Sequence, residues 1–198
     1  MEVKERKRKI RIAVFASGNG SNTERLAEYF MEHDQIEISL ICCNNPKAYV
    51  LDRAKRLNIP TCLFDRPAFY ESTYILDVLK RHKIDWIVLA GFLWLIPENI
   101  LKAYTNRIVN IHPALLPAYG GKGMYGSRVY EAVLAADEKQ SGITIHYVNE
   151  KYDEGSIIFQ ATCPVDANDS PELLAQKIHQ LEYEYYQEVI EKLVLQSR

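Results

Sequence analysis

An asparagine, a histidine and a proline follow one another closely in the middle of the chain. Asn110 and His112 stand two residues apart, directly after the apolar pair Ile108 and Val109, so on an extended strand both side chains point the same way. Pro113 favours the end of that strand, because proline lacks a backbone donor and restricts the residue before it. An imidazole beside an amide can polarise a carbonyl and stabilise an oxyanion. The segment therefore predicts a catalytic site where a strand ends.

Asp153, further along the chain, offers the carboxylate that such a site uses to orient a water or accept a proton. Asp153 stands between two predicted strands, so an ordinary turn residue is the alternative reading. For His112 the alternative is a structural histidine that caps its loop. His146 lies inside a predicted strand, where packing is the simpler role, and Thr144 on the same strand face can support His112 only indirectly.

A glycine loop at residues 17–22, with the sequence Ser-Gly-Asn-Gly-Ser-Asn, lies between an apolar strand and a predicted helix. Backbone N–H groups at such a helix N-terminus favour an anion. The hydroxyl and amide side chains of Ser21 and Asn22, after Gly20, favour a ligand over the alternative of a simple tight turn. The loop is neither a G-x-G-x-x-G motif nor a P-loop, because Gly18 and Gly20 are followed by Ser21-Asn22-Thr23 and by no lysine. It predicts a site for a phosphate monoester.

Three further features allow two readings each. Residues 90–97 end another apolar strand and are core by default, although a flat heteroaromatic ligand would find stacking surface and backbone amides there. Residues 120–126 contain four glycines, which fits a floppy surface loop or a mobile lid beside His112 with Lys122 available to an anion. Glu182 on the last predicted helix is either solvated or directed at a substrate amine.

The remaining pattern predicts the elements that position these residues. Apolar runs indicate strands, and a period of three to four residues between them indicates helices. The predicted strands are 10–16, 36–43, 60–64, 85–91, 107–111, 142–148 and 157–165; the predicted helices are 23–33, 48–57, 70–82, a short one from Pro97, 126–136 and 170–195. The last two strands have a short connection and must pair antiparallel. The prediction is an α/β fold with a mostly parallel central sheet, helices on both faces and an antiparallel C-terminal strand pair.

Length and composition favour a single domain over residues 1–198 with small-molecule partners. The chain is 47% apolar and 25% charged, with a net charge of −2, which gives no reason to expect a nucleic-acid partner. Glutamates interrupt the basic residues near the N-terminus, so we interpret residues 1–9 as a flexible, solvated tail and not as a targeting or nucleic-acid patch. No apolar stretch approaches the roughly 18 residues that span a bilayer. A cytosolic protein without membrane contact is expected.

The spacing of cysteines and histidines argues against disulfides and metals. The four cysteines include no C-x-x-C pair, which favours core thiols in a reducing compartment. The five histidines include no pair with metal-ligand spacing. We therefore predict no metal cofactor.

Taken in order, these motifs resemble the formyltetrahydrofolate-dependent formyltransferases over nearly the whole chain. The resemblance rests on the glycine loop at 17–22, on Leu89-Ala90-Gly91-Phe92, on Asn110-Ile111-His112-Pro113 with Leu115-Leu116-Pro117, and on Asp153. The asparagine, histidine and aspartate with the Leu-Leu-Pro tail are similar to those of the whole family. The Gly-Asn-Gly-Ser-Asn loop resembles that of the members that formylate glycinamide ribonucleotide.

The resemblance implies a Rossmann-like formyltransferase fold and transfer of the formyl group from 10-formyltetrahydrofolate to the amine of glycinamide ribonucleotide in purine biosynthesis. It implies that Asn110, His112 and Asp153 are catalytic, with Asp153 keeping His112 protonated and the His112 cation stabilising the oxyanion together with Asn110. The implied binding and supporting residues are Gly20, Ser21 and Asn22 for the phosphate, Glu182 for the glycinamide substrate, Leu93, Trp94, Leu95, Ile96, Asn110, Asn149, Glu150, Lys151, Tyr152 and Asp153 for the folate, and Thr144 and His146 as supports.

Three alternatives stay open at this point. The first is a deformylase, in which water attacks the formyl group. The second is a formyltransferase for tRNA or a nucleotide sugar, whose relatives carry extra domains. The third is a non-catalytic nucleotide-binding module, in which the grouping of asparagine, histidine and aspartate is a coincidence. A monomer and a homodimer are both compatible with the sequence.

Overall fold

A computed structural model of the chain describes residues 8–197. Its strands form one seven-stranded sheet in the order β3-β2-β1-β4-β5-β6-β7. The strands are β1 (Ile10–Ala16), β2 (Ile36–Cys43), β3 (Thr61–Leu63), β4 (Trp86–Leu89), β5 (Ile108–His112), β6 (Gln140–Tyr147) and β7 (Ile157–Pro164). Neighbours from β3 to β5 pair parallel, whereas β6 is antiparallel to both β5 and β7. The predicted mostly parallel sheet and its antiparallel C-terminal pair are confirmed.

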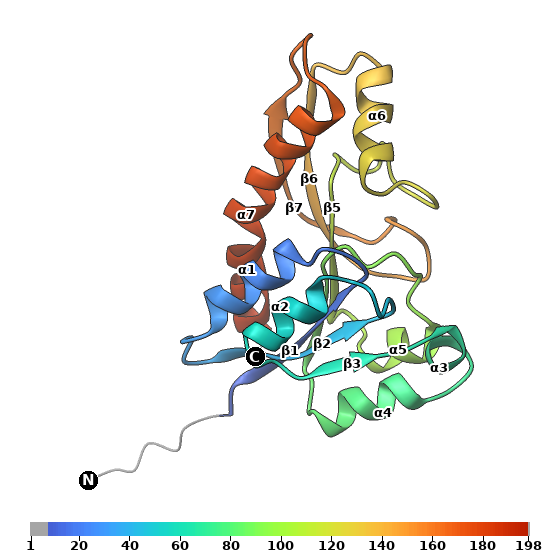
Figure 1. Cartoon of the computed structure of the whole chain (residues 1–198), viewed down its shortest axis with the longest axis vertical. Helices are drawn as coiled ribbons and strands as arrows, with labels where there is room; N and C mark the ends of the chain where they lie inside the picture. Colours follow the sequence, from blue (N-terminus) through green and yellow to red (C-terminus); the bar gives the residue numbers. More distant parts are fainter. Residues whose placement is uncertain (1–7, 198) are drawn as a thin grey trace.

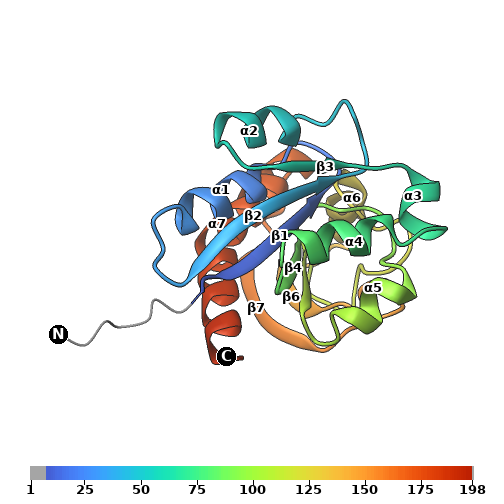
Figure 2. The ribbon, with the colours of Figure 1, turned by 90° about the horizontal axis from the view of Figure 1, so that it is seen from below.

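Helices cover both faces of the sheet (Figures 1 and 2). They are α1 (Ser21–Phe30), α2 (Val50–Arg56), α3 (Arg66–Tyr70), α4 (Tyr74–Arg81), α5 (Glu98–Ala103), α6 (Ser127–Ala135) and α7 (Pro171–Gln196). Side chains of α1, α6 and α7 join one buried cluster, and those of α3, α4 and α5 join another. The two clusters lie on opposite faces of the sheet.

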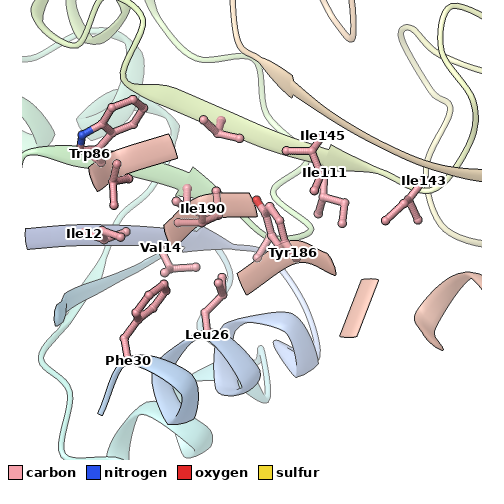
Figure 3. Packing of buried hydrophobic residues seen from close by; sticks show 14 of the residues in the cluster. Ile12, Val14, Leu26, Phe30, Trp86, Ile111, Ile143, Ile145, Tyr186 and Ile190 are labelled. Carbon is pink, nitrogen blue, oxygen red and sulfur yellow. The ribbon is translucent and has the colours of Figure 1, made fainter. Parts of the chain in front are cut away.

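The central strand β1 explains why the sheet must be covered twice. Ile12 and Val14 belong to the cluster under α1 and α7, which Figure 3 shows from close by. Ala13 and Phe15 belong to the cluster under α3 and α4. Because successive side chains of a strand point to opposite faces, an apolar run without alternation buries both faces. Strand β1 therefore ends between two layers of helices, and the loop that follows it at residues 17–22 begins between the same two layers.

The helix predicted at residues 70–82 corresponds to α4, which begins four residues later, at Tyr74, and a separate short helix before it, α3, was not predicted. The Ser72 hydroxyl donates to the Ala68 carbonyl at 2.8 Å and accepts from the Tyr74 amide at 3.1 Å. Such side-chain bonds to the backbone compete with the helix and interrupt it. At the start of α3, the Asp65 carboxylate accepts from the Ala68 amide at 2.9 Å and caps the helix.

Several predictions made from the composition of the chain can be compared with the structure. The predicted tail lies mostly at residues 1–7, outside the described part, but Arg8 donates to both Asp85 carboxylate oxygens at 3.0 and 2.8 Å. All four cysteines are buried and free. Within residues 8–197, no three side chains of the metal-binding types are grouped for a metal ion. The same residues include no helix of the length and apolarity that a membrane crossing requires.

Candidate active site

Asn110 and His112 end β5, where that strand pairs with β4 on one side and β6 on the other. The Asn110 amide nitrogen lies 3.1 Å from His146 Nε2. His146 Nδ1 lies 2.9 Å from the Tyr147 carbonyl oxygen, which can only accept, so Nδ1 carries the proton and Nε2 accepts from Asn110. His146 thus fixes the orientation of the Asn110 side chain, whose second N–H can point to a ligand.

His112 is almost fully buried, with 3% of its surface exposed. Its Nε2 lies 2.8 Å from the Tyr119 carbonyl oxygen, and a carbonyl requires a donor, so Nε2 carries a proton. The other ring nitrogen, Nδ1, lies 3.5 Å from the Asp153 carboxylate oxygen Oδ2. Nδ1 is therefore the atom of His112 at which a proton can be gained or lost.

Burial decides the charge of His112. Desolvation lowers the pKa of His112 and outweighs Asp153, the Tyr119 carbonyl and Glu182, which raise it, while His146 lowers it further. The neutral imidazole is therefore favoured in the free site near neutral pH. This differs from the expectation that Asp153 keeps His112 protonated, because the sequence does not show how deeply the ring is buried.

Asp153 is both a turn residue and a member of the site. Its φ is 57°, the left-handed region that Asp adopts more readily than most residues. Its Oδ2 accepts from the Gly121 amide at 2.9 Å, and its Oδ1 lies 3.6 Å from His146 Nε2. Burial alone would raise the pKa of Asp153, but His146, His112 and the Gly121 amide together bring it below its ordinary value. The carboxylate is ionised at neutral pH.

Thr144 supports the loop after His112, not the imidazole itself. The Thr144 hydroxyl donates to the Ala114 carbonyl at 2.7 Å and accepts from the Leu116 amide at 2.9 Å. Gln160 on β7 adds a second tie, because its amide nitrogen donates to the Thr144 hydroxyl at 2.8 Å and to the Leu116 carbonyl at 3.1 Å. Gln160 was not predicted from the sequence, since only the pairing of β6 with β7 places it beside Thr144.

The glycine-rich segment 120–126 begins inside the site. The Tyr119 carbonyl contacts His112 and the Gly121 amide contacts Asp153. A Cβ at Gly120 would lie 2.5 Å from Leu116 Cδ2 and 3.2 Å from Asp153 Cβ, so a larger residue would require Leu116 and Asp153 to shift. These contacts are made by backbone groups, so only the glycines themselves mark them in the sequence.

The predicted phosphate loop joins β1 to α1. Gly20 has φ 77°, and a Cβ there would lie 2.4 Å from Val50 Cγ2, so both conformation and space require glycine. Arg53 on α2 donates to the Asn19 carbonyl at 2.9 Å and braces the loop from outside. The first amides of α1, at Ser21 and Asn22, have no partner within the helix and suit an anion.

Glu182 on α7 is brought to this loop. The side-chain nitrogen Nδ2 of Asn22 donates to Glu182 Oε2 at 3.0 Å, and His179 Nδ1 lies 2.9 Å from the same oxygen. Glu182 is 5% exposed, which contradicts the solvated reading. The hydrogen bond to Glu182 raises the pKa of His179. His179 was not predicted from the sequence, although its position three residues before Glu182 on a predicted helix places the two side chains on one face.

The residues predicted to line the folate site differ in how much of their side chains is exposed. Leu93 is 44% exposed, and its amide donates to the Ser17 hydroxyl at 3.2 Å, which ties the loop after β4 to the loop after β1. Trp94 packs its ring against α3, with its centroid 5.7 Å from that of Phe69. Ile96 is buried in the core, so its side chain is not available to a ligand. Residues 149–152 form an exposed to half-buried loop that leads into Asp153.

Comparison with known proteins identifies the family. Residues 10–190 match the family model described as Formyl transferase. This chain belongs to the formyl transferase family. The phosphoribosylglycinamide formyltransferase of Bacillus subtilis (strain 168) is 39% identical over 190 residues, which cover 93% of this chain and 94% of that protein. The chloroplastic phosphoribosylglycinamide formyltransferases of Arabidopsis thaliana and Vigna unguiculata are 40% and 39% identical, and this chain spans 65% and 61% of their lengths.

Solved structures of the family share the fold. Glycinamide ribonucleotide transformylase 1 from Geobacillus kaustophilus superposes with a TM-score of 0.84 at 39% identity, over 93% of this chain and 98% of that one. Glycinamide ribonucleotide transformylase 1 from Symbiobacterium toebii gives a TM-score of 0.85 at 32% identity, over 96% and 90% of the two chains. The Rossmann-like arrangement predicted from the family resemblance is confirmed.

Proposed function

We propose that this chain transfers the formyl group of 10-formyltetrahydrofolate to the amine of 5′-phosphoribosylglycinamide, a step of purine biosynthesis. One observation carries the proposal: Asn110, His112 and Asp153 converge where β5 ends, in a chain whose anion-binding loop is tied to Glu182. The trio of Asn110, His112 and Asp153 fits the chemistry of a formyl carbonyl. The glycine loop with Glu182 fits a phosphate ester that also carries polar groups. The names of the relatives support formyl transfer to glycinamide ribonucleotide.

The nucleotide substrate is proposed to bind between α1 and α7. Its phosphate would accept hydrogen bonds from the backbone amides after Gly20, at Ser21 and Asn22, where the helix N-terminus favours negative charge. Glu182 would accept hydrogen bonds from the glycinamide substrate, and His179 beside it would offset the carboxylate charge near the phosphate. A buried carboxylate without such a partner would repel the phosphate.

The donor is proposed to lie between the loop at Leu93 to Ile96 and the loop from Asn149 to Asp153. The formyl oxygen would then accept from the free N–H of Asn110. As the substrate amine attacks the formyl carbon, a carbon–nitrogen bond forms and the carbonyl oxygen becomes an oxyanion. The oxyanion is stabilised by donors that are already in place, which lowers the barrier without reorganisation.

The lowered pKa of His112 fits a role in moving the proton. A developing oxyanion nearby favours the imidazolium, so Nδ1 can hold in transit the proton that the attacking amine loses on its way to N10. The ionised Asp153 can order a water that takes the proton from the attacking amine. The intermediate then collapses: the bond from the formyl carbon to N10 breaks, and N10 receives the proton that the amine has lost. The products are the formylated amide and tetrahydrofolate.

The test is a single assay with two readouts. The purified chain is mixed with glycinamide ribonucleotide and 10-formyltetrahydrofolate, and mass spectrometry follows both the formylated ribonucleotide and free formate. We expect formylated product in equal amount to the tetrahydrofolate formed. Formate without formylated product would indicate a hydrolase. Binding of the ribonucleotide with no turnover of the donor would indicate a nucleotide-binding module.

We propose the cytosol as the compartment of this protein. Its oligomeric state is open between a monomer and a homodimer, and a mass measurement in solution would separate the two.

A further inference from the structure

Glu24 stands near the start of α1, the helix whose first amides are proposed to bind the phosphate. The Glu24 amide donates to the Gly20 carbonyl at 2.9 Å, so Glu24 lies one turn after Gly20 on the same face of the helix. The positive end of a helix favours negative charge. The Glu24 carboxylate therefore competes with a phosphate for this end and repels it unless the carboxylate is neutralised.

Two arginines of the neighbouring helix α2 neutralise Glu24. Arg53 Nη1 pairs with Glu24 Oε2, and Arg56 Nη2 donates to Glu24 Oε1 at 2.8 Å. The side chains of Arg53 and Glu24 are 15% and 22% exposed, so salt and solvent screen this pair less than a fully exposed one. Both guanidinium groups also lie over the Tyr49 ring, 4.9 and 5.5 Å from its centroid. One carboxylate between two arginines leaves an excess of positive charge beside the glycine loop.

Arg53 also fixes the orientation of peptide groups in that loop. Its Nε donates to the Asn19 carbonyl at 2.9 Å, and its Nη2 donates to Asn19 Oδ1 at 2.7 Å. The Val50 amide on α2 donates to the Gly18 carbonyl at 3.2 Å. In a trans peptide group the C=O and the following N–H point in opposite directions, so the amides of Asn19 and Gly20 point away from α2. Successive amides held in this way suit an anion.

We propose that Arg53 is a positioning residue for the substrate phosphate. Through Asn19 it holds the amides of the glycine loop in the orientation that an anion needs, and with Arg56 it neutralises Glu24. The inference rests on the proposed function, in which a phosphate occupies this loop. Arg53 itself makes no contact with the substrate in this arrangement. It should therefore determine how strongly the enzyme prefers a phosphorylated substrate and should leave the formyl transfer itself unchanged.

Steady-state kinetics with two amine substrates test the inference. The substrates are glycinamide ribonucleotide and the corresponding riboside, which lacks the phosphate. In Arg53→Ala we expect the KM for the ribonucleotide to rise about tenfold, since weakened charge-assisted hydrogen bonds to an anion have this magnitude. The kcat, the KM for the formyl donor and the kcat/KM for the riboside should stay near wild type. Arg53→Lys should recover part of the loss, because lysine keeps the charge but cannot form both bonds to Asn19.

A substitution at Glu24 separates the electrostatic role from a merely structural one. In the Arg53→Ala background, Glu24→Gln should lower the KM for the ribonucleotide again by about threefold, the size of a partly exposed charge interaction. By itself, Glu24→Gln should not raise this KM. A structural role predicts the reverse, since Glu24→Gln also weakens the contact with Arg56. If the double variant shows no recovery, the inference is wrong.

Lys55→Ala is the matched control. Lys55 is an exposed cation on the same helix α2, so its removal should leave the KM for the ribonucleotide unaffected. An equal effect of Lys55→Ala would overturn the inference, because general electrostatic attraction would then explain the result. An unchanged KM for the ribonucleotide in Arg53→Ala, or equal weakening of the ribonucleotide and the riboside, would also overturn it. If Arg53→Ala does not fold, Arg53→Lys is held to the same two criteria.

A binding measurement separates this inference from the proposed function. Ligand-observed NMR with ribose 5-phosphate alone requires no turnover. Binding to wild type and to Lys55→Ala, with loss in Arg53→Ala, would support the positioning role even if the chain formylated no ribonucleotide. No binding to wild type, or unchanged binding to Arg53→Ala, would overturn this role even if formyl transfer were demonstrated.

Discussion

Asn22 and Glu182 are joined side chain to side chain at 3.0 Å across 160 residues of sequence. The bond connects the glycine loop after β1 to the long C-terminal helix. Tyr186, one turn further along α7, donates from its buried hydroxyl to the Leu89 carbonyl at 2.8 Å, so the helix is fixed against the end of β4 as well. The two sides of the proposed ribonucleotide site therefore keep their spacing without a ligand.

Replacing His112 should remove catalysis and spare binding. We expect His112→Ala to lower kcat by about a hundredfold or more, as the loss of an oxyanion-stabilising group does, with both KM values near wild type. The Tyr119 carbonyl then loses its donor, so a melting curve should accompany the kinetics. A variant that folds and retains most of its turnover number would exclude His112 from the mechanism.

The two roles of Asp153 can be separated with one substitution. Asn tolerates the left-handed conformation observed at φ 57°, so Asp153→Asn should fold with a melting temperature close to wild type. Its activity should fall by about a hundredfold, because an amide cannot order the water or accept its proton as a carboxylate does. A sharp loss of melting temperature with normal activity per folded molecule would instead support a purely structural turn.

Gly20 tests the phosphate assignment. In Gly20→Ala, the new methyl group meets Val50 and the residue is strained at φ 77°. We expect the KM for glycinamide ribonucleotide to rise about tenfold or more, since weakened charge-assisted hydrogen bonds to an anion have this magnitude, with a much smaller change for the donor. The matched control is Gly18→Ala, where a Cβ meets nothing within 4 Å. Equal weakening of both substrates would indicate general misfolding, and a larger effect on the donor would mean that the two ligands are interchanged.

The pH profile of kcat/KM should have an acid limb that belongs to His112. The mechanism begins with the neutral imidazole, and burial lowers its pKa below the ordinary 6.5. Activity should therefore persist below pH 6.5 and fall only at more acid pH. Asp153 raises the pKa of His112, so Asp153→Asn should move this limb further to the acid side in its residual activity. A limb above the ordinary histidine pKa in wild type would contradict the burial argument.

The contact between His179 and Glu182 should make stability depend on pH. The folded-state pKa of His179 is raised, first by its hydrogen bond to Glu182, so the contribution to stability is fully present below the unfolded-state pKa. It is lost as pH rises through the raised folded-state pKa. The nearby groups are the Tyr183 ring, stacked on His179, and Arg25 over that ring. Melting temperatures of wild type and His179→Gln should thus converge above this range, and a constant difference at all pH values would contradict the linkage.

Sequence patterns were sufficient for most of the sheet and for the residues that end its strands. Strand β2 has the bounds expected from its apolar run, and Ser170 caps α7 through its bond to the Leu173 amide, as the Ser-Pro-Glu signature predicts. The helix expected at 70–82 begins only at Tyr74, and α3 before it was not expected, because Ser72 bonds to the backbone on both sides of the break between them. Periodicity shows which residues face the core but does not show such a competing local bond.

By itself, the sequence determined the alternation of strands and helices, the glycine loop between the first strand and the first helix, and the placement of Asn110 and His112 where a strand ends. These follow from local rules, because strand alternation, helix periodicity and turn chemistry act between residues close in sequence. Only the tertiary structure decided the burial that lowers the pKa of His112, the contact of Gly121 with Asp153 and the contact of Asn22 with Glu182. Desolvation and side-chain pairing depend on which distant segments the fold brings together, and no spacing along the chain contains that information.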